Sequence, residues 1–328
     1  MPEQLMPAFV KWNQWITKHL FILVLVAMIC GYFTAIERST LTSMMIALLF
    51  AYITFIGSLS SSLQEFLGVL KKPWKAIWIL MLLHIAVPLF SWGVGFLAFP
   101  DAFNTRMGLL IAATIPIAVS SLMWITITGG NLSLTLVAIT FDTLITPLFM
   151  PLFFYVLFGQ SVHLNYWSMI GELMLIITIP SLMGMVMHDV TRNRFSAFVN
   201  SVGAMTSKIA MFLIIVLNTG GIAHLIIWDT RLIRLLLVIL FLVCSGYIIG
   251  FLGWLPLRKD GRKTMICFVY NVGMRNIAFG SVLAFAYFPL ETVLPVTLFS
   301  LFQQPVAGIV SALLERSEKK EAAHGLDT

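Results

Sequence analysis

Residues 113–121 read ATIPIAVSS and residues 270–276 read YNVGMRN. Both stretches lie inside apolar runs long enough to cross a membrane, yet the first contains a proline and two serines, and the second contains glycine, arginine and two asparagines. Proline removes a backbone donor and clashes with the preceding helical turn. Non-helical backbone is tolerated at membrane depth only where protein or water surrounds it. The two stretches therefore predict broken helices inside a membrane protein.

The composition of the whole chain agrees with this prediction. The 328 residues are 59% hydrophobic and only 10% charged, whereas a soluble domain is roughly half apolar and a quarter charged. Apolar runs of about twenty residues, enough to cross about 30 Å of hydrocarbon as a helix, recur along the chain. We therefore expect an all-α integral membrane protein with about ten transmembrane helices, near residues 20–36, 41–59, 75–98, 106–128, 131–158, 166–187, 203–226, 232–255, 264–287 and 292–314.

The two interrupted spans occupy equivalent places in the order of spans. One is the fourth of the first five and the other is the fourth of the second five. Matched interruptions of this kind are typical of transporters built from inverted repeats, with the binding site near the bilayer midplane. The predicted division is a first repeat at residues 1–160 and a second repeat at residues 161–328 that ends in a short cytoplasmic tail.

The basic residues indicate an orientation. With an even number of spans, fourteen of the twenty Lys and Arg residues fall on the side of the two termini. Cytoplasmic loops carry an excess of such residues, so we expect both termini in the cytoplasm, most simply of a bacterial inner membrane. This distribution also accounts for the net charge of +6 without a nucleic-acid partner. The fourteen residues are Lys11, Lys18, Lys71, Lys72, Lys75, Arg192, Arg194, Arg258, Lys259, Arg262, Lys263, Arg316, Lys319 and Lys320.

Several polar residues lie within the spans. A guanidinium at the bilayer centre costs at least about 2.5–3.5 kcal/mol and must face a cavity or a partner, so Arg275 is either a fixed cation in a binding site or half of a structural pair. Asp142 is the carboxylate placed deepest in a span, and it could carry a proton, bind a cation or serve as the counter-ion of Arg275. For His84 an interhelical hydrogen bond is the simpler expectation. Gln303 and Gln304 could line a cavity or bond between helices.

Signatures of enzymes are missing from the sequence. It contains no zinc-protease motif, nucleophile elbow or phosphate-binding loop, and no cofactor is expected beyond Na⁺ or H⁺ as a coupling ion. Secondary transport of a small organic solute is the function that these observations favour.

The chain resembles the bile acid:sodium symporter family over nearly its whole length. The matching features are the proline-led stretch from Pro116 to Ser121, the Gly130-Asn131 pair that opens the fifth span, Pro147 late in that span, and Val272-Gly273-Met274 in the ninth. The resemblance implies a core domain and a panel domain, with broken fourth and ninth helices crossing in the core. It also implies two sodium ions behind the crossing and an organic anion between core and panel.

The resemblance places sodium ligands at particular positions. At the first site, a Ser-Asn pair, two hydroxyl residues and a glutamate correspond here to Ser121, Leu122, Thr135, Ile139 and Asn271. At the second site, two glutamines correspond to Leu83 and Arg275, and backbone carbonyls lie around Val272 and Met274. Ser121 and Thr135 are thus the residual metal positions.

These substitutions suggest a hypothesis about charge. Two sodium ions and one glutamate together carry +1, and Arg275 with a neutral Asn271 also carries +1. Arg275 would then replace the bound cations, and Asp142 would either supply proton coupling or leave an uncoupled facilitator. The expected substrate and ion site consists of Ser121, Thr135, Asp142, Asn271, Arg275 and Asn276. The alternative is a membrane ligand sensor on a transporter fold. The substrate, the direction of transport and the oligomeric state do not follow from these residues.

Overall fold

The computed structural model describes residues 15–16, 20–64, 73–158, 165–192 and 194–325, and these residues form helices and no strand. Four of the basic residues used to assign the orientation, Lys11, Lys18, Lys71 and Lys72, lie outside the described residues. In the first half of the chain the elements are α2 Leu20–Thr34, α3 Thr40–Ser58, α5 Trp74–Met81, η1 Leu82–Ala86, α6 Val87–Ala98, α7 Phe103–Thr114, α8 Ser121–Ile127 and α9 Leu132–Phe158.

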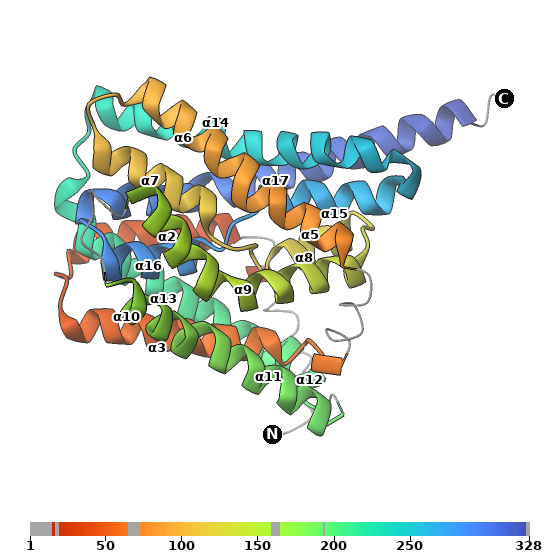
Figure 1. Cartoon of the computed structure of the whole chain (residues 1–328), viewed down its shortest axis with the longest axis horizontal. Coiled ribbons are helices and arrows are strands. Elements are labelled where there is room, and N and C mark those ends of the chain that lie inside the picture. The colour runs from red at the N-terminus through yellow and green to blue at the C-terminus, as the bar shows by residue number, and fades with distance from the viewer. Residues whose placement is uncertain (1–14, 17–19, 65–72, 159–164, 193, 326–328) are drawn as a thin grey trace.

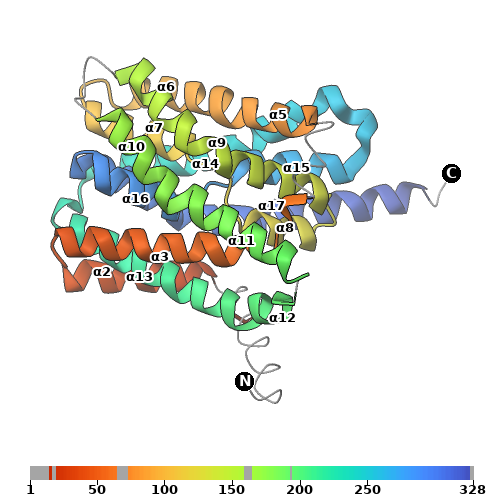
Figure 2. The same cartoon turned by 60° about the horizontal axis from the view of Figure 1, so that its bottom comes forward.

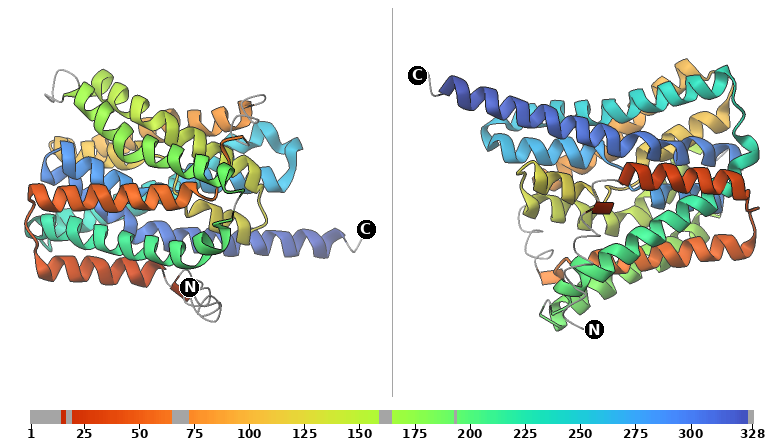
Figure 3. Two further views of the ribbon diagram at one scale, coloured as in Figure 1. Left: turned by 90° about the horizontal axis from the view of Figure 1, so that it is seen from below. Right: turned by 180° about the vertical axis from the view of Figure 1, so that it is seen from behind.

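The second half continues with further helices. They are α10 Tyr166–Leu173, η2 Met174–Thr178, α11 Ile179–Val190, α12 Ser196–Phe198, η3 Val199–Gly203, α13 Ala204–Ile222, η4 Ala223–Leu225, α14 Thr230–Trp254, η5 Leu255–Asp260, α15 Gly261–Gly273, α16 Ile277–Tyr287 and α17 Leu290–Gly325. The last of these continues well beyond the expected end at residue 314, and its C-terminal end projects from the bundle (Figures 1 and 3).

Seven helices in the described part of the chain are long and apolar enough to cross a membrane, so the protein is an integral membrane protein. The difference from the ten expected spans has local causes. The fourth span is divided into α7 and α8, which are each too short to cross alone. The ninth is divided into α15 and α16. Helices α14 and α15 are connected by the kinked segment η5 and pack against each other, so the stretch over residues 230–273 combines the eighth span with the first part of the ninth. Helix α2, within the residues that the structure describes, is 15 residues long, which is shorter than a full span.

The helices form two groups. On one side α13 packs against α2 and α3, and α3 packs against α11; Figure 2 shows α2, α3 and α13 together along one edge of the molecule. On the other side α14 packs against α15 and α17, while α7 packs against α6 and α17. Helix α16 contacts α3, α13 and α17, and therefore lies between the groups.

Both interruptions expected from the sequence are present, and each has a local cause. Helix α7 ends at Thr114, and Ile115 is extended with φ −62° and ψ 152°, the conformation that a following proline imposes. The other break begins at Gly273, which ends α15, and Met274 is extended with φ −108° and ψ 128°. Helix α16 then starts from Asn276, whose side-chain oxygen accepts from the Phe279 N–H at 3.3 Å, a standard N-cap.

Glycine is required at position 273 because α14 lies directly against it. A Cβ at this position would come within 2.5 Å of the Tyr247 ring, which is closer than carbon atoms tolerate. Tyr247 is itself buried and its hydroxyl donates to the Gln303 carbonyl at 3.4 Å, so the ring has little freedom to move away. The close approach of α14 therefore fixes where α15 ends.

We expect Gly273→Ala to destabilise the folded protein in detergent by about 1–3 kcal/mol, the usual cost of overpacking a buried site. Thermal unfolding monitored by thiol-reactive fluorescence measures the change. Gly93→Ala is the matched control, because a Cβ on Gly93 of α6 would meet no atom within 4 Å. Equal unfolding temperatures for the two variants would contradict the packing argument.

Candidate binding site at the crossing of the two broken helices

The two breaks meet through their backbones. Ile117 and Arg275 form an isolated antiparallel bridge. Two hydrogen bonds flank it, from the Ala118 N–H to the Met274 carbonyl at 3.2 Å and from the Asn276 N–H to the Pro116 carbonyl at 2.8 Å. Segments more than 150 residues apart in the sequence thus satisfy part of each other's backbone, as membrane depth requires.

The N–H groups of the bridged residues themselves point away from the bridge, as expected for a non-hydrogen-bonded antiparallel pair. Each finds a side-chain acceptor on the long helix that comes next along the chain. The Ile117 N–H donates to Asp142 Oδ2 of α9 at 2.6 Å, and the Arg275 N–H donates to Gln303 Oε1 of α17 at 2.8 Å. Asp142 and Gln303 therefore have the same role, because each accepts a hydrogen bond from the backbone of one break.

Asp142 is fully buried, and its hydrogen-bonded ionisable partner is His84. The His84 Nε2 lies 2.6 Å from Asp142 Oδ1, and the Thr146 hydroxyl donates to the same oxygen at 3.4 Å. Within the described residues no ion pair joins Asp142 to Arg275. The counter-ion that the sequence suggested for Arg275 is thus bonded to a histidine on η1 instead.

The Arg275 side chain is 4% exposed and incompletely bonded. Its Nε donates to the Ala113 carbonyl at 3.2 Å, while Nη1 is buried without a hydrogen-bond partner among the described residues. A buried donor on a charged group carries a large desolvation cost unless something pairs with it. The guanidinium is therefore ready to bind an acceptor that the chain does not itself provide.

Arg275 lines a cavity of about 250 Å³ between the two groups of helices. The charged residues that line this cavity in the described part of the chain are Arg275 and Lys208 of α13, both cations. Polar side chains complete the lining: Asn276, Gln303, Gln304, Ser120, Ser207, Ser281, Thr297 and Ser300. Apolar residues of α2, α3, α13, α16 and the break between α7 and α8 contribute the rest. A cavity with fixed positive charge and many neutral donors suits an organic anion.

Three of the expected site residues form a buried cluster behind the crossing. The Ser121 hydroxyl donates to Asn271 Oδ1 at 3.2 Å, and Asn271 Nδ2 donates to the Thr135 hydroxyl oxygen at 3.4 Å. The Thr135 hydroxyl lies 3.1 Å from the Asn131 carbonyl and 3.4 Å from the Cys267 thiol. All three polar side chains are fully buried, so they bond to one another.

This cluster fits a sodium ion poorly. A hard cation prefers several oxygen ligands, often including a carboxylate, whereas the cluster offers a neutral amide whose oxygen already accepts from Ser121. Leu122, Ile139 and Leu83 occupy three further positions at which the resemblance implies oxygen ligands, and hydrocarbon side chains have none. Within the described residues, no group of three or more His, Cys, Asp or Glu side chains could hold a metal ion.

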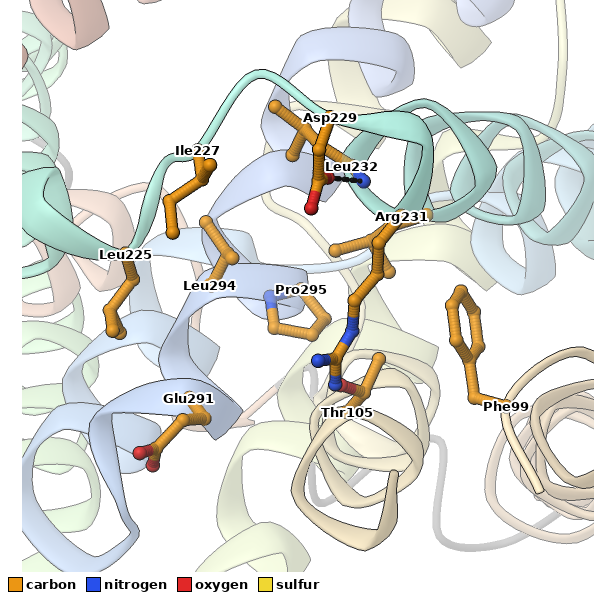
Figure 4. A pocket seen from close by; sticks show the side chains of 11 residues that line it. Phe99, Thr105, Leu225, Ile227, Asp229, Arg231, Leu232, Glu291, Leu294 and Pro295 are labelled. Carbon is orange, nitrogen blue, oxygen red and sulfur yellow. Dashed lines mark hydrogen bonds between the residues drawn. The ribbon is translucent and has the colours of Figure 1, made fainter. Parts of the chain in front are cut away.

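A second cavity, of about 220 Å³, lies near the junction of η4 and α14. Figure 4 shows the Arg231 side chain extending toward Thr105, and Asp229 accepting from the Leu232 N–H at the start of α14. The three charged residues that line it, Asp229, Arg231 and Glu291, are all exposed. Exposed charges remain hydrated and bind a ligand weakly, so the cavity at Arg275 is the better candidate site.

The sequence located part of this arrangement. It singled out Arg275 and Asn276, which line the main cavity, and Ser121, Thr135 and Asn271, which lie together. It did not connect Asp142 to His84 and did not assign Gln303 to the Arg275 backbone. These partners come from different spans, and their sequence spacing carries no signal of the contact.

We expect Asp142→Ala to destabilise the protein by about 1–3 kcal/mol for each buried group that it leaves unpaired, because the Ile117 N–H and His84 Nε2 both lose their acceptor. Asp142→Asn keeps an oxygen for Ile117 and should cost less. Thermal unfolding of both variants in the same detergent measures the difference. Equal losses would show that the backbone bond contributes nothing.

Comparison with known proteins agrees with this structure. Residues 45–228 match the sodium bile acid symporter family. The protein YbaS of Bacillus subtilis (strain 168) is 36% identical over 275 residues, which cover 83% of this chain and 89% of YbaS. A second protein of that strain, named as the sodium-dependent transporter YocS, is 22% identical over 284 residues, covering 87% of each chain. This chain therefore belongs to the sodium bile acid symporter family of membrane transporters.

Proposed function

We propose that the protein is a secondary transporter of a small organic anion, which binds in the cavity at Arg275. The observation that carries this proposal is the buried guanidinium, whose Nη1 has no partner in the described part of the chain and whose cavity has no acidic residue among its described lining. A carboxylate, sulfate or similar group would complete its hydrogen bonds with a charge-assisted pair.

Alternating access would follow from the position of the cavity between two groups of helices. The equivalent roles of Asp142 and Gln303, each accepting from the backbone of one break, support two inverted five-helix repeats at residues 1–160 and 161–328. In this view ten helices cross a bacterial inner membrane with both termini in the cytoplasm. The group with α2, α3 and α13 is the panel, and the group with α7, α14, α15 and α17 is the core.

We further propose that sodium does not drive this transporter. The cluster of Ser121, Thr135 and Asn271 satisfies its own polar atoms, and a fixed guanidinium at Arg275 would repel a cation at the second site, by about 4 kcal/mol at 4 Å in a medium of effective dielectric constant 20. The name of YocS describes a sodium-dependent transporter. At 22% identity that property can differ between the two proteins.

The alternative function is a membrane sensor that binds the anion without carrying it. A sensor and a carrier share the cavity and differ in whether the bound anion can leave on the other side. Ligand-induced thermal stabilisation without flux in proteoliposomes would identify a sensor.

The test is uptake of labelled pyruvate, taurocholate and other organic anions into proteoliposomes, with sodium or choline as the external cation. We expect uptake of at least one anion by the wild type, at a rate that changes less than about twofold between the two cations. Arg275→Gln should lower it by at least about tenfold, since a buried charged hydrogen bond contributes roughly 1.5–3 kcal/mol.

Arg231→Gln is the matched control, because it removes an exposed cation from the other cavity, and it should retain wild-type uptake. Full activity of Arg275→Gln, or uptake that requires sodium, would reject the proposal.

A further inference from the structure

The proposed function makes no use of the bond between His84 and Asp142. His84 lies in η1, a π-helical turn just before Pro88, where proline cannot supply the usual backbone donor. Its ring centroid is 4.4 Å from that of Phe149, and the side chain is 5% exposed. Nε2 bonds to Asp142, whereas Nδ1 is buried without a partner among the described residues.

A purely structural role does not explain why both members of the pair are ionisable side chains. The Ile117 N–H needs an acceptor, and at the equivalent place in the other half of the chain a neutral amide, Gln303, accepts from the Arg275 N–H. An amide would therefore have been enough at position 142. A carboxylate and an imidazole buried together cost far more desolvation than an amide does. The presence of two buried ionisable side chains at this place therefore indicates a role that uses their charge.

The charges around the crossing suggest that role. Asp142 accepts from the N–H of Ile117, the residue that faces Arg275 in the bridge, so the carboxylate and the guanidinium lie on either side of one backbone bridge and offset each other's charge. A monovalent anion bound at Arg275 would pair with the guanidinium and leave the fully buried Asp142 carboxylate without that compensating charge, which low-dielectric surroundings penalise. One proton added to the pair of His84 and Asp142 removes the uncompensated negative charge. Histidine is the side chain whose charge changes most readily near neutral pH.

We propose that His84 and Asp142 form a proton-binding site that takes up one proton when a monovalent anion binds at Arg275, so that anion and proton cross together. This inference rests on the proposed anion transport and names its coupling ion. The proton belongs to the hydrogen-bonded pair as a unit. One anion and one proton move in the same direction, and the step transfers no net charge. Each ligand favours the other by the same factor, as linkage requires.

Other titratable groups near the pair do not replace it. Arg275 lies in the break that follows α15, opposite Ile117, whose N–H bonds to Asp142. Tyr247 of α14 packs against Gly273, and Cys267 of α15 contacts Thr135. On helices that pack against η1 or α9, Lys75 pairs with Asp260, and Arg106 lies over aromatic rings. The remaining titratable groups on these helices are Tyr166, Glu172, Arg231, Arg234, Cys244, Arg262, Lys263 and Tyr270.

The first experiment detects binding and needs no transport. Full-length protein in lipid nanodiscs carries ¹⁵N-labelled histidine, and the spectrum of His84→Gln identifies the His84 signals. At one fixed pH, we expect saturating pyruvate to convert the His84 signals of the wild type to those of a ring protonated at both nitrogens, and to leave those of the folded Asp142→Asn variant unchanged. A wild-type ring that does not change when pyruvate is added would overturn the proposal.

The second experiment tests the coupling with labelled pyruvate as the probe in proteoliposomes. An acidic exterior should raise initial uptake by the wild type at least about fivefold, the lower end of usual coupling strengths, and clamping the membrane potential should not change it. His84→Gln and Asp142→Asn should lose the response to the pH gradient. His188→Gln is the control, because His188 bonds to the Leu59 carbonyl away from the crossing, and it should respond as the wild type does.

The results separate the two ideas. Uptake of pyruvate that ignores the pH gradient would overturn the coupling even where His84 binds a proton. If none of the organic anions is carried, the proposed transport fails, and the nanodisc experiment alone decides whether the pair binds a proton.

Discussion

The whole arrangement depends on the need to bond every backbone group inside the membrane. Breaking a helix there frees N–H and C=O groups that water cannot reach, and each unpaired group costs several kcal/mol. In this chain the two breaks lie against each other and form two backbone hydrogen bonds. The remaining N–H groups, of Ile117 and Arg275, donate to the side chains of Asp142 and Gln303. The breaks are thus mutually dependent, and neither would be stable alone.

The crossing also explains why a charge can be kept at this depth. Arg275 belongs to the bridge, so its backbone is fixed, and the residue lines both the cavity of about 250 Å³ and a void of about 10 Å³ beside Ala113. The guanidinium is anchored through Nε to the Ala113 carbonyl and keeps Nη1 for another partner. Its charge is permanent at physiological pH, unlike that of a bound cation, which can leave. A transporter with this residue would have a positive site without loading an ion first.

The sequence predicted the fold as far as local signals reach. Pro116 and the charged, glycine-containing stretch around Arg275 located both breaks, because proline and an intramembrane guanidinium act on the helix that carries them. The resemblance to the family brought Ser121, Thr135 and Asn271 together. The bond between His84 and Asp142, and the role of Gln303, were not predicted, since residues 58 and 28 positions apart meet only through tertiary packing. The separation of α14 from α15 agrees with the two spans expected there, because the charged η5 interrupts the apolar run.

The most direct test of the account is whether Ile117 and Arg275 face each other. Opposed residues of a non-hydrogen-bonded antiparallel pair have Cβ atoms roughly 4.5–5.5 Å apart, close to what a disulfide needs. In a variant without Cys30, Cys244 and Cys267, the pair Ile117→Cys and Arg275→Cys should cross-link on mild oxidation of the monodisperse protein. The pair Ile117→Cys and Ala286→Cys should not, because residue 286 lies near the far end of α16. Failure of the first pair to cross-link, or equal cross-linking of both, would contradict the crossing.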